Sequence, residues 1–264
     1  EVAALMPKLI THEVTHILQS TQYFYNPVTA SKAAWESEGG ATLAEQLVGN
    51  AVYGVGSGQN LGSTEWLLDY YTTDKWYYSW VGDLRQYFGL NSINAPEECT
   101  WLANDNGGPC WDGRAVYGVT ATLLRFILDQ YGPSYAGGEA ALIRDLTSSA
   151  QTGYDNLETV TGQSIGYLLT TFGISLWADG RISNHLTSWD LREILDLFQG
   201  TDYKLQPYTS SAAEPTSSHS VRGGSTAYLE WEPPSSHAPT SLRIRTPSDD
   251  ELPDVIGMWI LRIQ

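Results

Sequence analysis

Apolar residues recur at helical spacing close to the start of the chain. The positions are Leu5, Leu9, Ile10, Val14, Ile17 and Leu18. This periodicity predicts a helix over residues 3–22. The same reasoning predicts helices over 40–48, one or two within 61–90, and then over 114–131, 137–149, 163–178 and 188–199. Gly49, Gly132-Pro133 and Gly200 follow three of these segments, where helix-ending residues are expected.

The pattern changes after about residue 205. Residues 207–240 are rich in Ser, Thr and Pro, which favour loops. Strand-like runs occur at Thr226–Trp231, Leu242–Arg245 and Met258–Ile263. We therefore expect an α+β fold that is predominantly helical. A helical lobe covers residues 1–205, and residues 206–264 form a linker and a small antiparallel β module.

The composition indicates a globular protein with an acidic surface. The 264 residues are 42% hydrophobic and 17% charged, which is enough apolar material for a core. The 30 acidic residues outnumber the 14 Lys and Arg, giving a formal net charge of −16. Such a surface repels nucleic-acid phosphates and anionic lipids, so we expect neither nucleic acid nor a membrane as a partner.

Two cysteines, Cys99 and Cys110, enclose a segment rich in turn-forming residues. Their closeness favours a disulfide over two unrelated thiols, and disulfides persist in oxidising compartments, so we expect an extracellular, secreted protein. Within this segment, Asn-Asp-Asn-Gly-Gly at 104–108 offers oxygen ligands for a structural Ca²⁺, although its spacing is not that of an EF-hand.

The sequence His-Glu-Val-Thr-His at 12–16 is the strongest chemical signal. Residues four apart share one face of a helix, so His12 and His16 can present two imidazoles to one Zn²⁺. Glu13 lies about 100° further round the helix, where it can act as a general base without being a ligand. The alternative is a pair of ordinary surface histidines. A catalytic zinc site needs a third protein ligand.

Residues 35–45 have the form W-x-x-E-G-x-A-x-x-x-E. With the preceding motif, this segment resembles the gluzincin zinc metallopeptidases, and the hyicolysin-type peptidases in particular. The resemblance implies a zincin-like helical lobe in which Glu38 is the third zinc ligand, with Glu36 as its rival. In related peptidases a β-sheet precedes the zinc-binding helix. Few residues precede residue 12 here, so we expect that this sheet was removed, lies in another chain, or belongs to a longer protein of which this chain is a fragment. Gly39, Gly40 and Ala41 would let the Glu38 helix approach the first helix.

Four further residues are candidates for supporting roles. Glu45 lies seven residues after Glu38, on the same helical face, and could orient a ligand histidine by accepting its other N–H. A solvated glutamate is the alternative. The resemblance implies a Tyr or His that stabilises the oxyanion, for which Tyr117 is the first candidate and His185 the second. Arg114 is a candidate anchor for a carboxylate or carbonyl.

These features predict a secreted zinc peptidase that hydrolyses peptide or protein substrates with Glu13 as general base. One alternative is a catalytically incomplete binding or structural module that lacks the substrate-binding sheet. Another is a different zinc hydrolase, or a carbohydrate-binding protein that uses the aromatic residues of 61–90. The helical spacing of those aromatic residues favours a role in the core.

Overall fold

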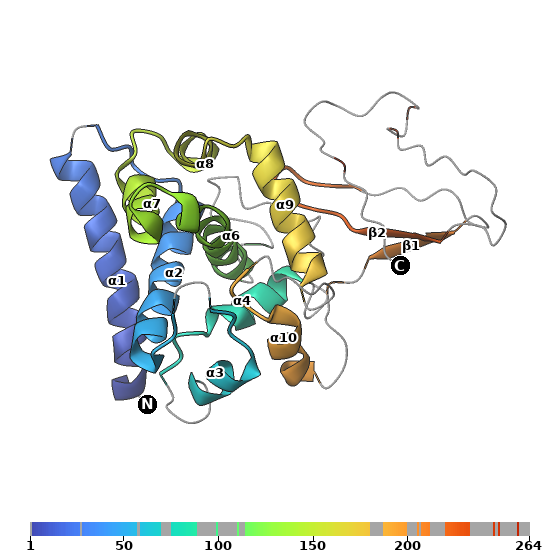
Figure 1. Ribbon diagram of the computed structural model, residues 1–264, viewed down its shortest axis with the longest axis horizontal. Coiled ribbons are helices and arrows are strands. Elements are labelled where there is room, and N and C mark those ends of the chain that lie inside the picture. Colours follow the sequence, from blue (N-terminus) through green and yellow to red (C-terminus); the bar gives the residue numbers. More distant parts are fainter. Residues whose placement is uncertain are drawn as a thin grey trace.

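The computed structural model is built mainly from α-helices (Figure 1). It describes residues 2–26, 28–56, 59–69, 75–88, 114–179, 187–199, 207–211 and 220–232, together with residues 99, 110, 205, 245, 248 and 258. The helices are α1 (Val2–Tyr25), α2 (Ala34–Tyr53), α3 (Ser63–Leu67), α4 (Trp80–Tyr87), α6 (Ala115–Tyr131), α7 (Gly138–Ser148), α8 (Gly153–Thr161), α9 (Ile165–Ala178) and α10 (Leu191–Gln199). The predicted predominance of helix is confirmed.

Helix α6 lies at the centre of the molecule because its apolar residues cover more than one face. Leu123, Phe126 and Leu128 point to different sides of the helix and are all buried, and α6 packs against both α2 and α4. The contact with α4 is a direct backbone contact, since a Cβ on Gly118 would lie 2.2 Å from the Leu84 backbone nitrogen. Only a glycine permits so close an approach.

Helix α2 is longer than the predicted segment 40–48. It runs through Gly49, which does not end the helix: a Cβ there would lie 2.6 Å from the Tyr77 Cβ. The helix ends instead at Gly54, whose left-handed φ of 71° is typical of a C-cap. Packing against neighbouring side chains therefore keeps Gly49 in the helix despite the low helix propensity of glycine.

The aromatic segment contributes to the core, as its helical spacing predicted. The buried members are Trp66, Tyr77, Tyr78, Trp80, Tyr87 and Phe88. The Trp80 ring meets the Trp189 ring edge to face, with the ring centroids 4.7 Å apart, and the Tyr78 ring does the same at 5.1 Å.

Cys99 and Cys110 are buried and form the predicted disulfide, with their Cα atoms 4.9 Å apart. Among the described helices, none is long and apolar enough to cross a membrane.

The two described C-terminal strands are parallel, so the predicted antiparallel pairing is wrong. Strand β1 (Tyr208–Ser211) pairs with β2 (Leu229–Glu232), with Tyr208 opposite Leu229. The intervening residues 212–228 are numerous enough for the crossover that a parallel pair requires, whereas a tight hairpin would need only a few. The chain before β2 packs on α9, where the Tyr228 hydroxyl donates to the Gly173 carbonyl at 2.8 Å.

Candidate metal centre

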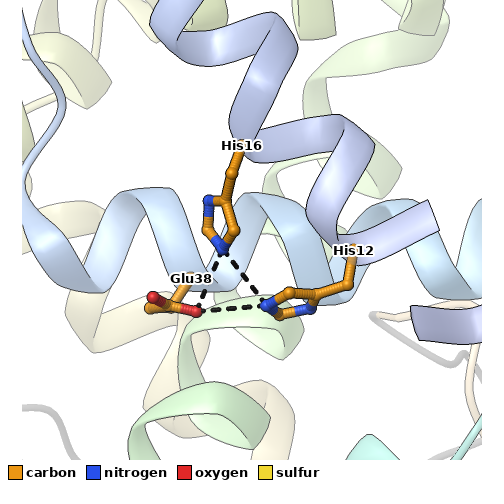
Figure 2. A group of neighbouring side chains, drawn as sticks. All are labelled: His12, His16 and Glu38. Carbon is orange, nitrogen blue, oxygen red and sulfur yellow. Dashed lines mark hydrogen bonds and ion pairs between the residues drawn. The ribbon is translucent and has the colours of Figure 1, made fainter. Parts of the chain in front are cut away.

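Helices α1 and α2 lie side by side and bring three metal-binding side chains together (Figure 2). His12 and His16 project from one face of α1, and Glu38 reaches them from α2. The two Nε2 atoms are 3.2 Å apart, and they lie 3.3 Å (His12) and 3.4 Å (His16) from Glu38 Oε2. All three side chains are partly buried, and together they could hold a metal ion.

These distances can be compared with those in a tetrahedral zinc site. Ligand atoms about 2.05 Å from a tetrahedral Zn²⁺ lie about 3.3 Å from one another. The three observed separations are 3.2, 3.3 and 3.4 Å. Two imidazole nitrogens and one carboxylate oxygen are also a donor set found in catalytic zinc sites. The spacing of the three donor atoms is therefore compatible with a bound metal ion.

The Nδ1 atoms of both histidines face oxygen acceptors. His12 Nδ1 lies 2.8 Å from Glu45 Oε1, and His16 Nδ1 lies 3.2 Å from Gln19 Oε1 and 3.2 Å from Ser37 Oγ. A proton on each Nδ1 satisfies these acceptors and leaves the Nε2 lone pair for a metal. Such hydrogen bonds fix the tautomer and the ring orientation of metal ligands.

The charges around the histidines favour a cation at the point where the three donors meet. Hydrogen bonds with Glu38 and then Glu45 raise the pKa of His12 to about 9, against the opposing effect of burial. The same hydrogen bond with His12 lowers the pKa of Glu38. A proton or a metal cation would satisfy this demand for positive charge.

Glu13 and Tyr117 contribute no donor to this group. Glu13 is exposed on α1. The Tyr117 ring centroid lies 6.3 Å from that of His12. Burial raises the pKa of Tyr117, and the charges of Glu38 and, more weakly, Glu13 raise it further. The phenol therefore keeps its proton and can donate a hydrogen bond beside the metal-binding group.

Glu36, the rival third ligand, faces away from the histidines. It is buried against α8, where it accepts from the Gly153 backbone N–H at 2.7 Å and from the Asn156 amide.

Two neighbouring glycines of α2, Gly39 and Gly40, face different helices. A Cβ on Gly40 would meet Gln19 of α1, whereas one on Gly39 would meet Thr120 of α6. The expectation that both glycines serve the approach to α1 is therefore wrong for Gly39.

Two sequence candidates lie outside the described residues: His185 and the proposed calcium ligands at 104–108. Conversely, the structure adds supporting residues that the sequence reasoning missed. Gln19 and Ser37 hold His16, and Lys8 lies 3.4 Å from Glu45 Oε2. Gln19 could have been found, because it follows His16 by three residues and so shares its helical face.

Comparison with models of protein families, with curated proteins and with solved structures gives no match. The candidate metal centre therefore rests on the geometry of this chain alone.

Proposed function

We propose that the chain is a secreted zinc-dependent peptidase of the gluzincin type. The observation that carries this proposal is the arrangement of His12, His16 and Glu38, whose donor atoms have the mutual spacing of tetrahedral zinc ligands. The Cys99–Cys110 disulfide supports an oxidising, extracellular location.

Bound zinc would supply a Lewis acid and make a water molecule nucleophilic near neutral pH. Glu13 follows the ligand His12 directly and is exposed, so its carboxylate can reach a water molecule or a substrate at the site. Its role is to take a proton from the attacking water and to pass it to the nitrogen of the departing amine. Glu13 therefore acts first as a base and then as an acid.

Tyr117 is our candidate for the donor that stabilises the oxyanion developing on the scissile carbonyl. Its ring lies beside that of His12, and its raised pKa keeps the hydroxyl protonated. A donor aimed at the developing negative charge is worth about 10²- to 10³-fold in kcat. Phenylalanine at this position would keep the ring and remove the donor.

The metal content of the purified chain tests the proposal. Plasma mass spectrometry should find about one zinc per wild-type chain, as expected for a single three-ligand site. His16→Ala and Glu38→Ala should lose it. Glu13→Gln is the matched control: it should keep the zinc and lose peptide hydrolysis. Absence of zinc from the wild type after reconstitution would contradict the proposal. Zinc binding without hydrolysis that depends on Glu13 would indicate the incomplete binding module instead.

A further inference from the structure

Arg114 brings a guanidinium group close to the candidate metal centre. Its Cζ lies 5.2 Å from the centroid of the Tyr117 ring, which is itself 6.3 Å from the His12 ring centroid. These two distances place the guanidinium within about 12 Å of the His12 ring. A positive group of this kind stands out in a chain with a formal net charge of −16.

The backbone of Arg114 is held in an unusual conformation. Its φ of 59° is left-handed, which is uncommon for a residue with a side chain. The residue immediately precedes α6, and its carbonyl accepts from the Tyr117 N–H at 3.0 Å. Asp83 of α4 lies 3.5 Å from its Nε, and the close contact at Gly118 fixes α4 against α6. Strained residues of this kind cluster at binding and catalytic sites.

The Arg114 side chain remains open to a ligand. It is 62% exposed, and its ion pair with Asp83 runs through Nε. Among the described residues, Asp83 is the one carboxylate that forms an ion pair with Arg114. Paired guanidinium nitrogens match the two oxygens of a carboxylate, which is why arginine is preferred for carboxylate recognition.

We propose that Arg114 binds a carboxylate of the peptide held at the His12–His16–Glu38 site. This inference rests on the proposed function and specifies its substrate class. One residue of an extended peptide spans at most about 3.6 Å, so the carboxylate would lie within about three residues of the scissile bond. Two sources share this chemistry: the C-terminal carboxylate of a short peptide and an Asp or Glu side chain.

Binding measurements on the full chain test the proposal without requiring turnover. The Glu13→Gln variant is titrated calorimetrically, with and without zinc, against two pairs of peptides. The first pair is N-acetyl-trialanine with a free carboxylate or a C-terminal amide. The second is N-acetyl-Ala-Glu-Ala-amide and its Gln counterpart. Within at least one pair, the carboxylate peptide should bind on the order of tenfold more tightly, as expected for a charge-assisted hydrogen bond.

Substitutions of Arg114 assign the preference to that residue. Arg114→Gln should abolish the preference for the carboxylate peptide, and Arg114→Lys should keep part of that preference. Arg114→Gly should also abolish it, and the variant should fold normally because glycine adopts a left-handed φ without strain. Arg144→Gln is the matched control. Arg144 is 69% exposed, and its Nε also lies 3.5 Å from an aspartate, Asp145, but on α7.

The outcomes separate the inference from the proposed function. A preference within the first pair assigns a C-terminal carboxylate, and one within the second pair assigns an acidic side chain. Equal binding within both pairs overturns the inference, as does a preference that survives Arg114→Gln. A chain that prefers carboxylates through Arg114 but holds no zinc refutes the peptidase and keeps the subsite. Hydrolysis that depends on zinc, without any carboxylate preference, supports the peptidase and refutes the carboxylate subsite.

Discussion

Glu45 holds the imidazole of His12 in place from the side opposite the candidate metal. Its carboxylate is buried, with Oε1 2.8 Å from His12 Nδ1 and Oε2 3.4 Å from the ammonium of Lys8. Lys8 is also hydrogen-bonded to Ser79, near the start of α4. The orientation of His12 is therefore set by a chain of contacts that runs away from the site into the protein.

We expect Glu45→Ala to weaken zinc binding by about 10- to 100-fold, because the ring of His12 loses the acceptor that fixes its orientation. Competition for zinc with a chromophoric chelator measures this affinity. Glu13→Gln serves as control, since Glu13 contributes no donor, and its affinity should stay close to that of the wild type. Equal affinities for Glu45→Ala and the control would show that Glu45 does not position His12.

Asp83 makes stability depend on pH. Burial raises its pKa from 3.8 to about 6, with the charge of Arg114 opposing the shift. The folded state therefore holds this proton more tightly than the unfolded chain. Its stabilising contribution is complete below about pH 4 and is lost as the pH rises through about 6.

Asp83→Asn removes this ionisation. The free energy of unfolding of the variant relative to the wild type should rise by about 2–3 kcal/mol between pH 4 and pH 7. Urea unfolding at several pH values measures the difference. A difference that stays constant with pH, or that falls, would contradict the assignment.

At the scale of elements, α1 is attached to the molecule along one side only. The inner side carries His12 and His16, whereas the outer side is apolar and exposed. The large exposed residues of this side are Met6, Leu9, Ile10, Val14, Ile17 and Leu18. Within the described chain, α1 packs chiefly on α2 and less on α7. The residues whose spacing predicted this helix are thus largely its exposed ones.

The α4–α6 contact offers a test with a control in the same helix pair. Gly118→Ala forces a Cβ against the α4 backbone, where no flexible side chain can yield, and should cost about 3 kcal/mol. Gly82 lies in α4 with no neighbouring atom within 4 Å. Gly82→Ala should therefore stabilise the protein by about 0.5–1 kcal/mol, because alanine favours the helix. Denaturant midpoints compare the two, and similar values would refute the close contact.

Local sequence patterns predicted most helices, but they failed where distant contacts decide the structure. Helix α8 was not predicted, because Gly153–Thr161 has few apolar residues. Its start is fixed instead by Glu36, which accepts from the Gly153 N–H and the Asn156 amide. The parallel pairing of β1 and β2 likewise depends on how two segments distant in the sequence meet, which no local pattern reveals.

In the candidate site, too, some residues could be predicted from local spacing, whereas others depend on contacts between distant segments. Helical spacing alone placed His12 and His16 on one face, because residues four apart are about one turn apart. Glu38 comes from another helix, so it was reached only through a family resemblance. The supporting contacts of Ser37 and Lys8 depend on how α1 sits against α2 and α4, and no spacing rule predicts them.

At the scale of the whole molecule, the candidate metal centre and the two strands lie at opposite ends. Figure 1 shows α1 along one flank and β1 and β2 beyond α9 on the other. The metal donors come from α1 and α2 alone, and α2 in turn packs on the central helix α6. A bound metal would therefore join the peripheral α1 to the core.

Zinc should raise the melting temperature of the wild type, because a ligand that binds only the folded state stabilises it. At a free zinc concentration 100 times the dissociation constant, the free energy of unfolding rises by about 2.7 kcal/mol. Differential scanning calorimetry with and without zinc measures it, and Glu38→Ala should show a much smaller shift. An equal shift in both proteins would place the stabilising metal elsewhere.

The one-sided attachment of α1 also affects how fast a bound metal could leave. Two of the three donors would move away together if α1 separated from α2, while the buried core around α6 stayed folded. Helices with few buried contacts open more often than the whole protein unfolds. The residence time of the metal would then follow the opening rate of α1, so amide hydrogen exchange in this helix and the rate of metal loss to a chelator should change together.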